Sequence, residues 1–324
     1  MSDRSLSAAA LALALVACFA PDHASAYCRM RAGGEPQIGD EPCPTEGAPL
    51  FWNNACLSYA IDHRNSNWMS YAEVEEAIDL AFLTWQEADC GGGTSPSLIF
   101  EPLQPSTCRL AEFNENGPNV NTIAFLNPWR DPCADADKPG YSRLAFAVTI
   151  VWHNTKTGEI FDADMMINDE EAVRGSNAGG PYANCPDTGC PPGNPGVADL
   201  RSIVTHEAGH FIGIGHSPDP EATMFAAADR RSVEKRDLAE DDINAVCDIY
   251  PVGGSVDTES CDPIGGLQLD CEDAESGNPL VCGEPSGGCS ASRAPADAPW
   301  TAIVAALIGL TGMRRRSRRH DARS

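Results

Sequence analysis

The segment from residue 206 to residue 216 constrains this chain more than any other feature. It reads His206-Glu207-Ala208-Gly209-His210-Phe211-Ile212-Gly213-Ile214-Gly215-His216. Two histidines four positions apart on a helix lie on one face, so His206 and His210 can reach a single metal ion. Gly213 can adopt a left-handed conformation that ends the helix and returns the chain, which brings His216 to the same ion. Three protein ligands leave one tetrahedral position open, and an open position is typical of catalytic zinc.

Glu207 follows the first histidine directly, so its carboxylate projects beside the expected metal. A carboxylate in this position is a candidate general base that takes a proton from water. The long pattern is too specific to arise often by accident in 324 residues with 7 histidines and 29 glycines. The sequence therefore predicts His206, His210 and His216 as zinc ligands and Glu207 as the catalytic residue.

Two residues after the motif point to a family. Ser217 directly follows the third histidine, and Met224 stands eight residues beyond it. With the motif, they resemble the matrixin branch of the metzincin metalloproteases, in which a methionine turn follows at this distance. The resemblance implies that Met224 forms an apolar floor beneath the metal, a role compatible with that of an ordinary buried methionine. The same two residues disfavour the astacin-like and reprolysin-like branches.

Hydrophobic periodicity predicts three helices within the region of resemblance, residues 56–251. Residues 70–73 form a capping box, and apolar residues then recur at helical spacing through Trp85. The helix that carries the motif should start near Asp199, and a last helix should cover residues 238–250 before Pro251.

Strand-like apolar runs cover residues 57–61, 97–100, 121–126, 144–152 and 159–167. The resemblance implies an α+β, metzincin-type catalytic domain. Its expected parts are a twisted, mixed five-stranded sheet with an antiparallel edge strand, two long helices, and a small C-terminal subdomain with one helix. Matrixins bind a peptide as an extended strand against an edge strand, which here should lie within residues 144–152.

The chain divides into five expected regions. They are a signal peptide (1–26), a cysteine-containing N-terminal segment (27–55), the metalloprotease domain (56–251), an acidic, cysteine-rich stalk or mini-domain (252–289), and a spacer, apolar segment and arginine-rich sorting tail (290–324). The leader ends in Ala24-Ser25-Ala26, a pattern that signal peptidase recognises. A competing interpretation takes residues 15–18 as a lipobox that leaves Cys18 lipidated.

The apolar run of residues 300–313 is short for a membrane helix and precedes the arginine-rich run 314–319. With the glycines and Cys289 upstream, this end resembles the MYXO-CTERM type of bacterial sorting tail. The resemblance implies export and sorting machinery as partners, transient membrane association, and a final place outside the cell or on a bacterial cell surface. A permanent short anchor remains the alternative, and lipidation at Cys289 remains open.

Cysteine usage agrees with export. The chain has 14 cysteines, and an even number remains when Cys18 and Cys289 are set aside, as disulfides in an oxidising compartment require. Cys185 and Cys190 flank a short Pro/Gly loop and are expected to pair locally. The net charge of −25 disfavours nucleic acid as a partner.

The chain also departs from the matrixin pattern. Too few histidines lie outside the motif for the family's second, structural zinc: His23, His63, His153 and His320. No cysteine-switch prosegment precedes Cys56, although Cys28 and Cys43 leave a divergent version open. Phe225-Ala226 replaces a proline that is usual after the methionine, so the specificity pocket cannot be transferred.

Calcium is a second expected cofactor, supported mainly by the resemblance. Hard oxygen ligands could come from Asp162, Asp164, Asn168, Asp169, Asp131, Asp135 and Asp137. The competing interpretation is that these are solvated loop side chains.

These observations predict an exported zinc metalloendopeptidase that acts on protein or peptide substrates. The alternative is a non-catalytic surface or adhesion protein that retains the metzincin scaffold, since a fold does not settle a function. All three histidines and Glu207 are present, which favours the enzyme.

Overall fold

A computed structural model describes residues 27–33, 42–130, 141–142, 144–170, 181–192, 196–271 and 300–310. The expected signal peptide, Cys18, Cys289 and the arginine-rich run lie outside these ranges. So do three of the candidate calcium ligands, Asp131, Asp135 and Asp137.

The helices are α1 (Tyr71–Gln86), α2 (Leu200–Phe211), α3 (Glu240–Ile249) and the single 3₁₀ turn η1 (Glu234–Arg236). The strands are β1 (Phe51–Trp52), β2 (Cys56–Ile61), β3 (Ile99–Pro102), β4 (Thr122–Leu126), β5 (Ala145–Asn154), β6 (Glu159–Asn168), β7 (Tyr182–Ala183), β8 (Ala198–Asp199), β9 (Ala227–Asp229) and β10 (Trp300–Leu310). Each helix and strand expected from the periodicity has a counterpart close to its predicted bounds.

The predicted capping box starts α1. The Ser70 backbone N–H donates to Glu73 Oε2 at 2.9 Å, and the Glu73 N–H donates to Ser70 Oγ at 3.4 Å. The buried residues of α1 are those that helical spacing selects, namely Val74, Ala77, Ile78, Ala81, Phe82 and Trp85. One apolar face of α1 is therefore available to pack against the rest of the domain.

The main sheet has the strand order β3-β2-β4-β6-β5-β10-β9, with β1 beside β6. The pairs β2–β3, β2–β4 and β4–β6 are parallel, whereas β5 is antiparallel to β6. The five expected strands lie next to one another in this sheet, but the described sheet is wider. The prediction that β5 is an edge strand is wrong, because β10 pairs with the outer side of β5.

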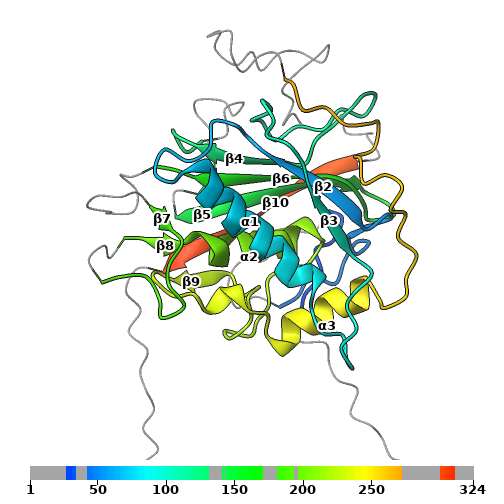
Figure 1. Ribbon diagram of the computed structural model, residues 1–324. Helices are drawn as coiled ribbons and strands as arrows, with labels where there is room; N and C mark the ends of the chain where they lie inside the picture. Colours follow the sequence, from blue (N-terminus) through cyan, green and yellow to red (C-terminus); the bar gives the residue numbers. More distant parts are fainter. Residues whose placement is uncertain are drawn as a thin grey trace, which may run out of the picture.

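Two helices cover one face of the sheet (Figure 1). Leu57, Tyr59 and Ile61 of β2 belong to the same apolar cluster as the inner faces of α1 and α2. Trp85 of α1 also donates from Nε1 to the Thr205 carbonyl of α2 at 2.7 Å. This contact fixes α2 against α1 above the sheet.

A second apolar cluster lies on the opposite face, because successive side chains of a strand point to opposite sides. It includes Leu126, Val148, Ile150, Trp152 and Met166, with Phe113 and Tyr141 packed against it. Strands β4 and β5 are thus buried on both faces, which explains their near-continuous apolar sequences.

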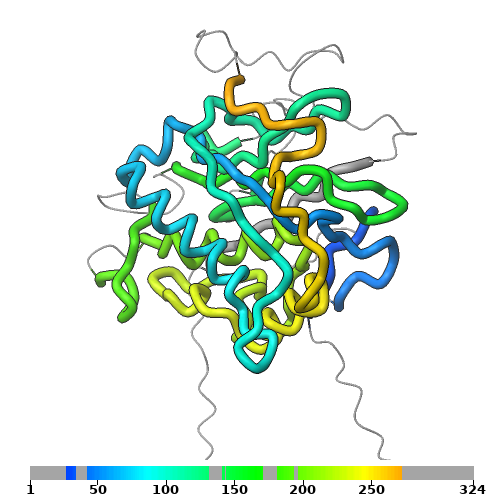
Figure 2. The backbone as a smooth tube through the Cα atoms, turned by 45° about the vertical axis from the view of Figure 1, so that its right-hand side comes forward, coloured from blue at the N-terminus to red at the C-terminus, as the bar shows by residue number. Residues whose placement is uncertain are grey.

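The described part of the expected stalk, residues 252–271, packs against the sheet domain. Disulfides join Cys56 to Cys261 and Cys108 to Cys271. Figure 2 shows this orange segment following the length of the molecule from the end of α3. It is therefore fastened to the sheet domain at two points.

The other described disulfides are Cys28–Cys43, Cys90–Cys247 and the predicted local pair Cys185–Cys190. Among the described residues, no helix combines the length and apolar character needed to cross a membrane. The apolar run near the C-terminus forms strand β10 over Trp300–Leu310.

Candidate metal centre

Helix α2 carries the first two histidines of the motif, and its start is held firmly. Its N-cap, Asp199, accepts hydrogen bonds from the Ser202 backbone N–H at 2.9 Å and from Ser202 Oγ at 2.8 Å. The Arg236 guanidinium also donates to both oxygens of Asp199, at 2.7 and 2.6 Å. A buried cap with these partners fixes the position of α2.

The helix ends where the motif places a glycine. Gly213 has φ +89°, a left-handed conformation that L side chains rarely adopt. A Cβ at this position would also lie 2.7 Å from the Leu50 carbonyl oxygen. Glycine is required on both grounds, and the turn that it permits returns His216 toward α2.

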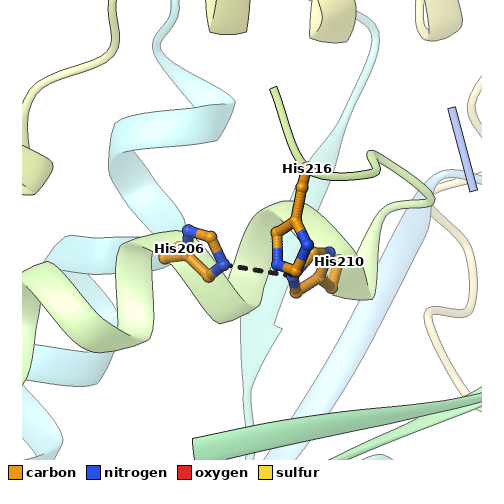
Figure 3. Close-up of side chains that lie close together, drawn as sticks. All are labelled: His206, His210 and His216. Atoms are coloured by element: carbon orange, nitrogen blue, oxygen red, sulfur yellow. Dashed lines mark hydrogen bonds between the residues drawn. The ribbon is translucent and has the colours of Figure 1, made fainter. Parts of the chain in front are cut away.

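The structure brings the three predicted histidines together (Figure 3). His210 Nε2 lies 3.1 Å from His206 Nε2 and 3.1 Å from His216 Nε2. All three residues are buried. One ligand atom from each of these histidines lies within 4.8 Å of the other two, which is close enough for all three to hold one metal ion.

Backbone carbonyls determine which ring nitrogens carry the protons. His206 Nδ1 donates to the Thr223 carbonyl at 2.7 Å, and His210 Nδ1 donates to the Ile214 carbonyl at 2.8 Å. Because a carbonyl only accepts, the Nε2 atoms are left with lone pairs that face one another. Burial, followed by repulsion from His210, lowers the pKa of His206 well below 6.5. Burial, followed by repulsion from His216, does the same for His210.

These features fit a zinc ion. Zn–N bonds of about 2.0–2.1 Å at tetrahedral angles separate neighbouring nitrogens by about 3.3 Å, close to the two observed separations. Neutral imidazoles with Nδ1 bonded to a carbonyl are the form in which histidine binds metal. Inward-facing lone pairs without protons repel one another, and a shared cation relieves that repulsion.

Met224 packs directly against α2. A Cβ added to Gly209 of α2 would lie 2.2 Å from Met224 Sδ and 2.8 Å from Trp85 Cζ2. The glycine between the two ligand histidines therefore allows close packing of the methionine against α2. Met224 is 1% exposed and belongs to the main core cluster.

Two residues that the sequence did not single out hold the methionine turn, residues 222–225. Asp242 of α3 accepts from the backbone N–H groups of Thr223 at 2.7 Å and Met224 at 3.0 Å. Lys235 Nζ donates to the carbonyls of Thr223 and Phe225, each at 2.7 Å, and to that of Ala222 at 3.2 Å. Burial lowers the pKa of Lys235 to about 7. No spacing rule marks either residue, because both contacts depend on how α3 and η1 pack.

Glu207 is also positioned from outside the motif. Thr149 of β5 donates from Oγ1 to Glu207 Oε2 at 2.6 Å. Both residues are fully buried. This bond fixes the orientation of the Glu207 carboxylate and links α2 to β5. A single threonine within an apolar strand gave no signal in the sequence.

Among the described residues, the acidic candidates for calcium, Asp162, Asp164 and Asp169, do not form one cluster of metal ligands. Asp164 accepts from the backbone N–H groups of Thr122 at 2.8 Å and Glu112 at 3.0 Å. Asp169 accepts from Ser66 Oγ and from the backbone and side chain of Asn67. Neither oxygen of the buried Asp162 accepts a hydrogen bond. Calcium therefore stays a prediction.

Comparison with known proteins places the chain in a family. The matrixin profile matches residues 51–251. Metalloendoproteinase 1 of Glycine max is 41% identical over 54 residues, which are 17% of each chain. Metalloendoproteinase 5-MMP of Arabidopsis thaliana is 37% identical over 76 residues, which are 22% of this chain and 21% of that protein.

A longer match covers more of the molecule. Neutrophil collagenase of Homo sapiens is 27% identical over 227 residues, which are 68% of this chain and 38% of that protein. The chain spans well under two thirds of the length of each of these relatives. Because the family profile covers most of the chain, from β1 through the histidine cluster to the end of α3, the chain belongs to the matrixin family.

Proposed function

We propose that this chain is a zinc-dependent metalloendopeptidase. The observation that carries the proposal is the convergence of three Nε2 atoms in a chain of the matrixin family, with Glu207 next to His206 in the sequence. The names of the two plant relatives describe metalloendoproteinases, and a peptide bond is the corresponding substrate class.

In this proposal His206, His210 and His216 hold the metal. When bound, zinc supplies a Lewis acid for a water molecule and for the scissile carbonyl. Glu207 takes a proton from that water and later returns it to the leaving amine. Thr149 keeps the Glu207 carboxylate in the orientation that this proton transfer needs. The methionine turn supports the histidine cluster from below.

The cellular setting is part of the same proposal. The leader over residues 1–26 and the five described disulfides favour an exported protein. Export and C-terminal sorting machinery are the proposed partners. A calcium ion bound by acidic side chains remains a proposed structural cofactor.

Replacement of Glu207 by glutamine tests the catalytic assignment. The amide oxygen can still accept from Thr149, but it cannot take a proton, so casein cleavage by zinc-loaded protein should fall about 10²- to 10⁴-fold. Zinc content measured by atomic absorption should stay unchanged. The matched control is Glu234→Gln, which changes an exposed glutamate of η1 and should retain activity.

Two results would contradict the proposal. Cleavage by Glu207→Gln at the wild-type rate would exclude Glu207 as the base. Wild-type protein that binds zinc and cleaves no protein or peptide would favour the non-catalytic scaffold.

A further inference from the structure

The C-terminal strand β10 completes the main sheet beside the metal centre. Residues 300–308 pair antiparallel with β5, from Trp300 opposite Asn154 to Ile308 opposite Ala145. Residues 308–310 pair parallel with β9. Figure 1 shows β10 lying between β5 and β9. One segment of chain thus bridges two strands that are otherwise not joined.

This position is next to the proposed catalytic base. Ala305 lies opposite Thr149 in the β5–β10 ladder, and the Thr149 hydroxyl donates to Glu207. On the other side, β9 begins three residues after Met224. Helix α2 contacts both β5 and β10. The backbone of β10 therefore passes along the metal centre, between the strand that orients Glu207 and the segment that follows the methionine turn.

Without β10, the outer backbone groups of β5 would be unpaired. An edge of unpaired N–H and C=O groups is a template for an added strand, and extended peptides bind such edges through backbone hydrogen bonds. The resemblance to matrixins implies that this same strand binds the peptide. A substrate and β10 cannot pair with one edge at the same time.

We propose that residues 300–310 occupy the substrate-binding edge between β5 and β9 and compete with peptide substrates in cis. The inference rests on the proposed peptidase function. The segment Trp-Thr-Ala-Ile-Val-Ala-Ala-Leu-Ile-Gly-Leu has no charge and no proline, so nothing in it opposes strand pairing.

The tether strengthens this competition. Residues 272–299 join β10 to Cys271, which is held to the domain by its disulfide with Cys108. A tethered segment acts at an effective concentration of the order of millimolar, so even weak pairing excludes a dilute substrate. Removal of the C-terminal tail would then open the site and couple processing of the tail to activity.

A double variant of the full chain tests the competition. Ala305→Pro with Ala306→Pro removes two successive N–H groups, and since these alternate in direction along a strand, one of them faces β5. The matched control, Ala305→Ser with Ala306→Ser, keeps both N–H groups. On a short fluorogenic peptide, the proline form should show a KM lower by about tenfold or more, with kcat unchanged. Equal KM values for the two forms would overturn the proposal.

Hydrogen exchange gives a readout that does not depend on activity. In the Glu207→Gln background, which keeps the chain intact, amides of residues 145–153 should exchange faster in the proline form than in the serine form. Equal protection in both forms would show that β10 does not cover β5. If every zinc-loaded form that retains Glu207 lacks peptidase activity, the proposed function fails. Hydrogen exchange in the Glu207→Gln background then still shows whether β10 pairs with β5.

Discussion

Two buried carboxylates, one on helix α3 and one on strand β6, have very different surroundings. Asp242, beneath the metal centre, accepts from the backbone N–H groups of Thr223, Met224 and Ala239. Asp162, inside strand β6, accepts no hydrogen bond at either oxygen. Their exposures are 1% and 0%, so burial alone does not distinguish them.

The difference shows what a buried charge can do when its partners are present. Burial raises the pKa of Asp242, while its three backbone donors and Lys235 oppose that rise. Burial and the adjacent Asp164 raise the pKa of Asp162 well above 3.8. A carboxylate with donors organises a turn, whereas one without donors depends on a proton or a cation.

The largest effect is expected from Asp242→Ala. This change leaves several buried N–H groups without an acceptor, so the free energy of unfolding should fall by about 3–5 kcal/mol in urea denaturation. Glu240→Ala, at an exposed position in the first turn of the same helix, should change it by less than about 1 kcal/mol. Similar losses for the two variants would remove the distinction between the methionine turn and an ordinary surface.

Lys235→Met should lower the free energy of unfolding by less than Asp242→Ala. Methionine fills the space but donates no hydrogen bond, so three carbonyls lose a partner and the free energy of unfolding should fall by about 1–3 kcal/mol. Because the Thr223 carbonyl also orients His206, zinc affinity measured by competition with a chelator should fall as well. Lys156→Met, at an exposed position, is the control. Unchanged zinc affinity would show that the methionine turn does not influence the metal site.

Asp162→Asn should change the free energy of unfolding least, and it should raise it. An acid whose pKa is raised on folding contributes stability below its unfolded pKa, and this contribution is lost as the pH rises through the folded pKa. Asparagine carries no charge, so the variant should be more stable than wild type by roughly 1 kcal/mol at neutral pH, with the gap closing toward pH 4. Asp164→Asn is the contrasting variant and should destabilise, because Asp164 accepts two backbone hydrogen bonds.

Adding calcium to wild type and to Asp162→Asn gives a second comparison of the two proteins. If the Asp162–Asp164 pair binds a cation, millimolar Ca²⁺ should raise the Tm of wild type and leave that of Asp162→Asn unchanged. An equal response of both proteins would place any calcium elsewhere.

Local patterns accounted for most of the elements. The capping box at Ser70 and Glu73 and the spacing of the apolar residues predicted α1, and the motif placed both ligand histidines on α2. These predictions succeed because helix geometry relates residues three or four positions apart. The predicted edge position of β5 was wrong, because nothing in its sequence shows which distant strand pairs with it.

The apolar run near the C-terminus shows the same limit. Its composition suits both membrane association and a buried strand, since both environments favour uncharged, apolar residues. Pairing with β5 and β9 is a property of the folded chain, and no pattern within residues 300–310 predicts it.

Within residues 206–216, the sequence specifies the residues that are proposed to bind the metal, since three histidines and a glutamate lie on one helix and the turn that ends it. The folded chain supplies the rest: Thr149 to orient Glu207, Asp242 and Lys235 to hold the methionine turn, and β10 to cover β5. These contacts join residues far apart in the chain, so they exist only after the sheet and helices have packed.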